Sequence, residues 1–166
     1  MEMNFYVFFL AALVPMIIGS IWYGPLFGKT WMNLMGFTEE SMKDANMLKI
    51  FGLSYVFSFI VAFGLMPMVI HQMGMYQVLI NEPGFTEQTG EAYKLFEQFI
   101  TSYGDMHRDF KHGALHGGIF ALFSITPILS IIALFERKSF KYVAINAGYW
   151  VVTLAIMGGI VCQWAM

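Results

Sequence analysis

Aspartate and histidine side chains gather in one polar stretch, Asp105 to Gly118, which leads into an apolar run of about twenty residues. If the helix of that run extends back over the polar residues, Asp109, His112 and His116 share one face, because they lie three and four residues apart. Asp105 precedes Asp109 by one further turn. No other part of the chain concentrates titratable groups in this way.

Two imidazoles at i and i+4 on a helix can bind one divalent metal ion, with each nitrogen about 2.0–2.1 Å from it. Asp109 is the predicted third ligand or orienting carboxylate, and His71, at the end of an earlier apolar run, is the predicted fourth. The H-x-x-x-H spacing lacks the glutamate of the H-E-x-x-H motif, so other roles stay open. The imidazoles could instead bond headgroups and loop carbonyls at the membrane surface, or serve a proton relay.

The composition indicates a membrane protein. Of 166 residues, 58% are hydrophobic and only 12% are charged, which is half the charge of an ordinary soluble domain. The net charge of −2 and the lack of basic clusters beyond Arg137-Lys138 exclude nucleic acid as an expected partner. Cys162 is the single cysteine, so no disulfide can form within the chain. The first apolar run lacks a basic flank and a cleavage site, and we expect it to remain as a membrane anchor.

Four apolar runs are each long enough to cross about 30 Å of hydrocarbon as a helix. They cover residues 5–23, 50–70, 113–135 and 142–164, and none contains Asp, Glu, Lys or Arg. The predicted fold is therefore all-α, a single polytopic domain over residues 1–166 with four transmembrane helices. Pro15, Pro67 and Pro127 lie inside three of the runs and are expected to kink them.

The loops differ in charge, and this predicts an orientation. Loops 24–49 and 136–141 carry six basic residues, whereas the loop at 72–111 carries three. The positive-inside rule then places both termini and the 72–111 loop outside the cell membrane. This outer loop contains an amphipathic helix near residues 89–104, and all four histidines fall on its side of the membrane. In the first loop, Thr38 is expected to cap a helix that leads into the second span.

Several segments resemble one known membrane family. They are Trp22–Trp31, Met35–Glu40, Asn146–Trp150 and Gly158-Gly159, which together are similar to the family catalogued as domain of unknown function 1761. The resemblance covers most of the chain, although the loop at 73–111 is longer than expected for that family. It implies a compact four-helix membrane fold and no established activity.

Gly113 and Gly117 form a G-x-x-x-G pattern beside the histidines, and small residues at this spacing let a second helix approach closely. The approaching helix could belong to the same chain or to a second copy. Asn146 and Tyr149 are expected to make a polar contact inside the bundle. The first of these patterns predicts helix packing through Gly113 and Gly117.

The sequence contains no nucleophile with an adjacent base and no phosphate-binding loop, so we predict no catalytic or cofactor-binding residues. The predicted function is a non-enzymatic component of a homo-oligomeric or hetero-oligomeric membrane assembly, with the lipid bilayer and another membrane protein or a second copy as partners. One alternative is a small-solute transporter or channel. The other is a protein that binds metal or protons through its outer Asp/His cluster.

Overall fold

The computed structural model describes residues 3–43 and 45–166, and its regular elements are helices. Within these residues, four helical segments are long and apolar enough to cross a membrane: Phe5–Leu26, Met47–Val69, Phe110–Phe135 and Phe140–Trp164. The predicted all-α membrane fold with four spans is thus confirmed.

Three of the spans begin two or three residues earlier than hydropathy predicts, because polar residues cap them. The side chains of Asn46, Asp109 and Ser139 accept hydrogen bonds from backbone N–H groups three residues further on. Each cap satisfies one of the free donors at a helix start, and the first turn that follows includes polar residues. These helices therefore start before the apolar runs from which the spans were predicted.

Two of the prolines lie where a span is interrupted. The first span consists of α1 (Phe5–Ala11), α2 (Val14–Ile21) and the π-helical turn η1 (Trp22–Leu26), and Pro15 lies in the first turn of α2. The third span consists of α8 (Phe110–Phe120), the π-helical turn η2 (Ala121–Ile125) and α9 (Thr126–Phe135), where Pro127 lies in the first turn of α9. Proline lacks the N–H that would continue a helical ladder, which accounts for both interruptions. Pro67 stays inside the continuous helix α5 (Met47–Val69).

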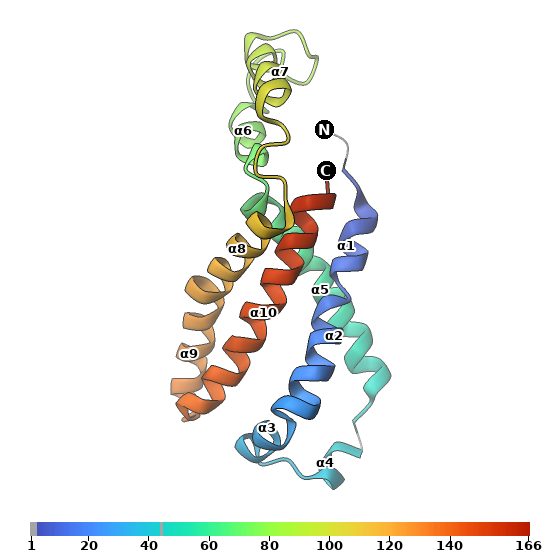
Figure 1. Ribbon diagram of the computed structural model, residues 1–166, viewed down its shortest axis with the longest axis vertical. Coiled ribbons are helices and arrows are strands. Elements are labelled where there is room, and N and C mark those ends of the chain that lie inside the picture. The colour runs from blue at the N-terminus through green and yellow to red at the C-terminus, as the bar shows by residue number, and fades with distance from the viewer. Residues whose placement is uncertain (1–2, 44) are drawn as a thin grey trace.

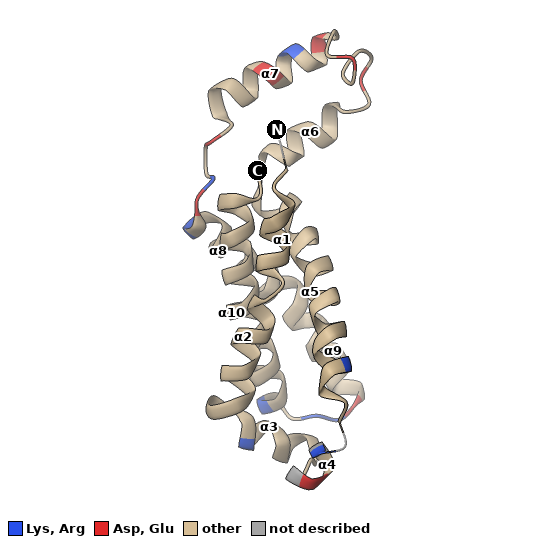
Figure 2. Cartoon of the chain, turned by 90° about the vertical axis from the view of Figure 1, so that its right-hand side faces the viewer, with Lys and Arg blue, Asp and Glu red and all other residues tan. Residues whose placement is uncertain are grey.

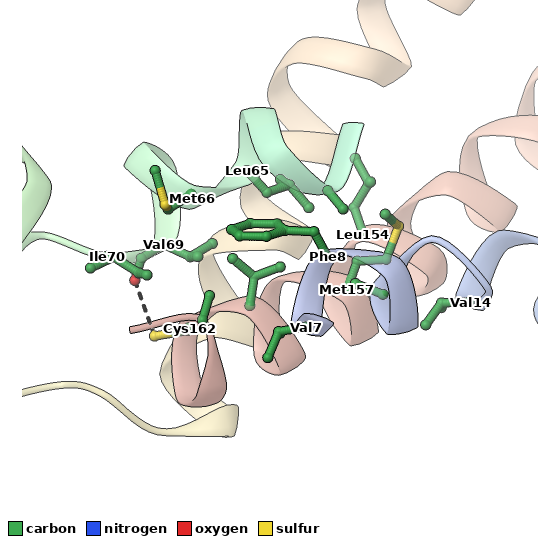
Figure 3. Packing of buried hydrophobic residues seen from close by; sticks show 14 of the residues in the cluster. Val7, Phe8, Val14, Leu65, Met66, Val69, Ile70, Leu154, Met157 and Cys162 are labelled. Atoms are coloured by element: carbon green, nitrogen blue, oxygen red, sulfur yellow. Dashed lines mark hydrogen bonds between the residues drawn. The ribbon is translucent and has the colours of Figure 1, made fainter. Parts of the chain in front are cut away.

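Helix α10 (Phe140–Trp164) is the centre of the bundle. In its most apolar stretch of 18 residues, 50% is buried inside the protein, whereas the corresponding share for the third span is 11%. Phe8 of α1 is fully buried between Leu65 of α5 and Leu154 of α10, within a cluster of apolar side chains contributed by all four spans (Figure 3). α8 packs along another side of α10. The first, second and third spans therefore all pack against α10.

Both termini lie at the same end of the bundle as α6 (Gln72–Leu79) and α7 (Glu91–Tyr103) (Figure 1). The opposite end holds α3 (Gly28–Met35), α4 (Glu39–Lys43) and the turn between α9 and α10. Charged residues gather near these two ends and leave the middle of the bundle uncharged (Figure 2). The direction of the chain across the membrane remains a prediction, and we call the end that carries the termini the terminal end.

The terminal end carries a helical hairpin made by α6 and α7, which projects beyond the bundle (Figures 1 and 2). α7 corresponds to the amphipathic helix predicted at 89–104, whereas α6 has no counterpart in the sequence-based prediction. The apolar side of α7 faces the hairpin itself, where Tyr76, Phe85 and Phe96 make edge-on and tilted ring contacts. These aromatic contacts hold α6, α7 and the link between them together.

At the other end, Thr38 caps a helix different from the one expected. Its Oγ1 accepts a hydrogen bond from the Ser41 backbone N–H, within the short helix α4. α5 starts separately, with Asn46 as its cap. The predicted cap is therefore present, but the helix that it starts ends at Lys43 and does not lead into the second span.

Candidate metal site

Three imidazoles meet at the terminal end of the bundle. His71 directly precedes α6, and His112 and His116 lie in the first two turns of α8. One nitrogen from each ring lies within 4.8 Å of a nitrogen of both others. The Nε2 atoms of His71 and His112 are 2.8 Å apart, a hydrogen-bond distance, and the rings of His112 and His116 have centroids 4.5 Å apart. Residues 41 positions apart in the chain thus converge on one point.

Helix α8 begins where it does because Asp109 caps it. The Asp109 Oδ1 accepts a hydrogen bond of 3.0 Å from the His112 backbone N–H. Once the helix starts there, the i,i+4 spacing sets His116 one turn above His112 on the same face. Asp109 is not part of the imidazole group in the described chain, and Asp105 lies in the link before α8. The aspartate that we predicted as a ligand therefore positions His112 through the backbone.

Gly113 and Gly117 bring α8 against α10 within the same chain. A Cβ at Gly113 would overlap the Gly158 carbonyl oxygen, and one at Gly117 would overlap the Leu154 carbonyl oxygen. Since both obstacles are backbone atoms, only glycine permits this approach. Of the two partners that the G-x-x-x-G pattern left open, the structure places the helix of the same chain there. The imidazoles occupy the neighbouring face of α8.

The segment between α7 and α8 is anchored on both sides of the site. The buried Gln72 Nε2 lies 3.1, 3.0 and 2.9 Å from the carbonyl oxygens of Tyr103, Gly104 and Met106, which share its two N–H groups. Arg108 reaches the C-terminal end of α10, where Nε donates to the Cys162 carbonyl at 2.7 Å. Its Nη2 donates to the Met166 carbonyl, also at 2.7 Å. A guanidinium is favourable at a helix C-terminus, where unpaired carbonyls carry partial negative charge.

A fourth histidine lies beside the group, and the sequence-based ligand set omitted it. The ring of His107 stacks on that of His112, with centroids 4.9 Å apart and an interplanar angle of 22°. A spacing of five residues does not place two side chains on one helix face, and His107 precedes the cap, so periodicity gave no signal. The only indication of its proximity was that all four histidines were predicted to lie on the same side of the membrane.

The environment of His71 favours its neutral form over its protonated form. Partial burial lowers the pKa of His71, and the positive charges that His116 and His107 would carry lower it further. A neutral imidazole offers a free nitrogen lone pair to a metal, whereas a protonated one does not. At neutral pH the group is therefore chemically available as a ligand.

A cavity of about 280 Å³ borders the imidazoles on the hairpin side. Its lining comes from the start of α6, the end of α7 and the following link: His71, Gln72, Phe99, Tyr103, Met106 and His107. Two histidine rings thus form part of the wall of a largely aromatic cavity. The space gives these rings room beside the bundle.

The opposite end of the bundle carries a separate polar cluster, which joins the first span to α10. The Tyr23 hydroxyl donates to Asn146 Oδ1 at 2.8 Å, and the Trp22 indole donates to the Ile145 carbonyl at 3.0 Å. The Tyr149 hydroxyl donates to the Pro15 carbonyl at 2.9 Å. The polar contact expected of Asn146 and Tyr149 is thus a pair of interhelical bonds, and these residues hold the bundle together.

The family of the chain follows from a sequence comparison. A family model described as "Protein of unknown function (DUF1761)" matches residues 6–162, almost the whole chain. The chain belongs to this family. Neither a curated protein nor a solved structure matches it. The match confirms the family expected from Trp22–Trp31 and leaves function to be argued from the site.

Proposed function

We propose that this membrane protein binds a divalent transition-metal ion through His71, His112 and His116 at its terminal end. The observation that carries the proposal is the convergence of the three ring nitrogens within 4.8 Å of one another. The rings come from two separate segments, so helical spacing alone does not account for their meeting. Imidazole is a common ligand of zinc, copper and nickel, and three such ligands suffice for a site with one open position.

The three nitrogens must move by different amounts to bind one metal ion, because the closest pair must separate slightly and a pair at the 4.8 Å limit must approach by about 1.5 Å. Two nitrogens bound to a tetrahedral ion at about 2.0–2.1 Å lie roughly 3.3 Å apart, as follows from the tetrahedral angle. The present 2.8 Å between the Nε2 atoms of His71 and His112 is a hydrogen bond between the two rings. Metal binding would replace this bond and separate the rings by about 0.5 Å. Both rings would then carry their proton on Nδ1, because each Nε2 must present a lone pair.

The donor set favours some ions over others. Three neutral nitrogens suit zinc, nickel, copper and cobalt, whereas magnesium and calcium require oxygen ligands. Asp109, the nearest predicted oxygen donor, accepts the His112 N–H as a helix cap. The site should therefore select borderline transition metals against magnesium and calcium.

A zinc titration of the purified protein in detergent tests the proposal. Wild type should bind one equivalent, and the His112→Ala/His116→Ala double variant should lose this binding while magnesium produces no signal with either protein. Lys111→Ala is the matched control, because Lys111 lies exposed in the same turn of α8. Equal zinc binding by wild type and the double variant would overturn the proposal.

The oligomeric assembly that the sequence suggests is a separate proposal. Gly113 and Gly117 already contact α10 in the same chain, so a partner would have to use another face. The third span has such a face, since only 11% of its most apolar stretch of 18 residues is buried. Its side chains Leu122, Phe123 and Ile131 are exposed. The mass of the detergent-solubilised protein tests this, and a strictly monomeric mass at all concentrations would remove the idea.

A further inference from the structure

We infer that His107 is a fourth metal ligand, which swings from its stacked position to close the coordination sphere. This inference rests on the proposed metal site and adds one residue to it. A tetrahedral ion held by three imidazoles has one position left, which either water or a fourth side chain fills. His107 is the histidine whose ring stacks on one of these three imidazoles.

The ring of His107 is contiguous with the three imidazoles. It stacks on His112 at 4.9 Å, and the His112 ring in turn lies 4.9 Å from that of His71 and 4.5 Å from that of His116. The His107 nitrogens are not part of the group within 4.8 Å. Coordination therefore requires a rotation of the ring, over a distance that a change of rotamer covers.

The backbone at His107 is held in a conformation that a non-glycine residue rarely adopts, with φ of +60°. Such a conformation carries a cost in free energy and persists only where the surroundings enforce it. Here the enforcing contacts flank the residue: the Met106 carbonyl accepts from Gln72, and Arg108 donates to the Cys162 carbonyl. The backbone is thus fixed on both sides of His107, and the side chain is left as the moving part.

The side chain also has room to turn. It is exposed, and it borders the cavity of about 280 Å³ that His71, Phe99 and Met106 also line. This volume is several times the roughly 30 Å³ that one water molecule occupies in the liquid. The cavity thus gives the His107 ring open space on its hairpin side.

Cobalt(II) is the probe for the test, because its visible absorption is intense when the ion is four-coordinate and weak when it is six-coordinate. The full-length protein in detergent is titrated with cobalt as wild type, as His107→Asn and as Met106→Ala. Asparagine tolerates a positive φ and so removes the imidazole while it keeps the backbone conformation. Met106→Ala is the control, since Met106 lines the same cavity without a strong metal ligand. His107→Gly serves as a second variant if the asparagine protein misfolds, because glycine adopts this φ without strain.

Wild type and Met106→Ala should bind cobalt with intense absorption. His107→Asn should bind it roughly tenfold more weakly or worse, since even loss of an outer hydrogen bond to a ligand costs about that much. Free imidazole added to His107→Asn should restore the wild-type affinity and spectrum by entering the space that His107 leaves. Unchanged affinity and absorption in both His107 variants would overturn the inference and leave the three-histidine site standing. If wild type binds no cobalt, both proposals are wrong.

Discussion

Replacing Gly117 by alanine tests how α8 is fixed against α10. The added Cβ would overlap the Leu154 carbonyl oxygen and carbon. Both are backbone atoms of α10, so they can move only if the helix moves. The two helices would have to separate or rotate, which would displace His116, the residue before Gly117. The same face carries Gly113, where a Cβ would overlap the Gly158 carbonyl oxygen.

The magnitude follows from two opposing effects. Alanine is better than glycine in a helix by about 0.8–1.0 kcal/mol, which favours the variant. Overpacking in a tight interface typically costs about 1–3 kcal/mol, and a backbone obstacle puts the cost at or above the upper part of that range. The net expectation for Gly117→Ala is therefore a destabilisation of about 1–2 kcal/mol.

The neighbouring glycine provides the control. A Cβ at Gly118 would lie 3.7 Å from the Ala155 Cβ, an ordinary van der Waals contact. Gly118→Ala should thus leave stability unchanged or raise it by up to about 1 kcal/mol. Equilibrium unfolding of both variants in mixed detergent, followed by intrinsic fluorescence, compares them directly. If Gly117→Ala is as stable as Gly118→Ala, the described packing of α8 on α10 is wrong.

Three further outcomes follow from the structure. Arg108→Met should destabilise the protein by about 1.5–3 kcal/mol, because two carbonyls at the end of α10 lose a charged donor, whereas Lys111→Met should not; equal unfolding curves would contradict this. The lowered pKa of His71 means that the unfolded state takes up a proton more readily, so stability of the metal-free protein should fall as pH drops below about 6.5. The melting temperature of His71→Ala should vary less with pH over this window, and identical pH profiles would count against it. Single cysteines at Ser41 and Ser139 should label from the cytoplasmic side and one at Thr89 from outside, so labelling of Ser41 and Thr89 from the same side would refute the predicted topology.

The fold was largely predictable because the bilayer imposes a simple requirement on the chain. Twenty apolar residues without charge can satisfy their backbone in hydrocarbon only as a helix, so hydropathy found all four spans. It missed the first turn of three of them, because Asn46, Asp109 and Ser139 are polar caps. It also missed α6, whose eight residues lack a strong apolar period and depend on aromatic contacts across the hairpin.

The site was predictable only where its residues share one helix. His112 and His116 follow from the i,i+4 rule, whereas the approach of His71 depends on how α5 packs against α8 and α10. Asp109 shows the limit of spacing arguments. An aspartate three residues before a histidine fits a metal-binding face and an N-cap equally well, and here the Asp109 side chain accepts the His112 backbone N–H as an N-cap. His107 was not predicted as part of the site, because its position depends on a left-handed backbone conformation that periodicity does not reveal.

X-ray absorption at the zinc edge, on the zinc-loaded protein, tests the central claim most directly. The account predicts a shell of nitrogen neighbours at about 2.0–2.1 Å, with the outer-shell scattering of at least three imidazole rings. The His112→Ala/His116→Ala variant should lose this pattern. A zinc shell made of oxygen alone, or the same spectrum from wild type and the double variant, would contradict metal binding by the histidines.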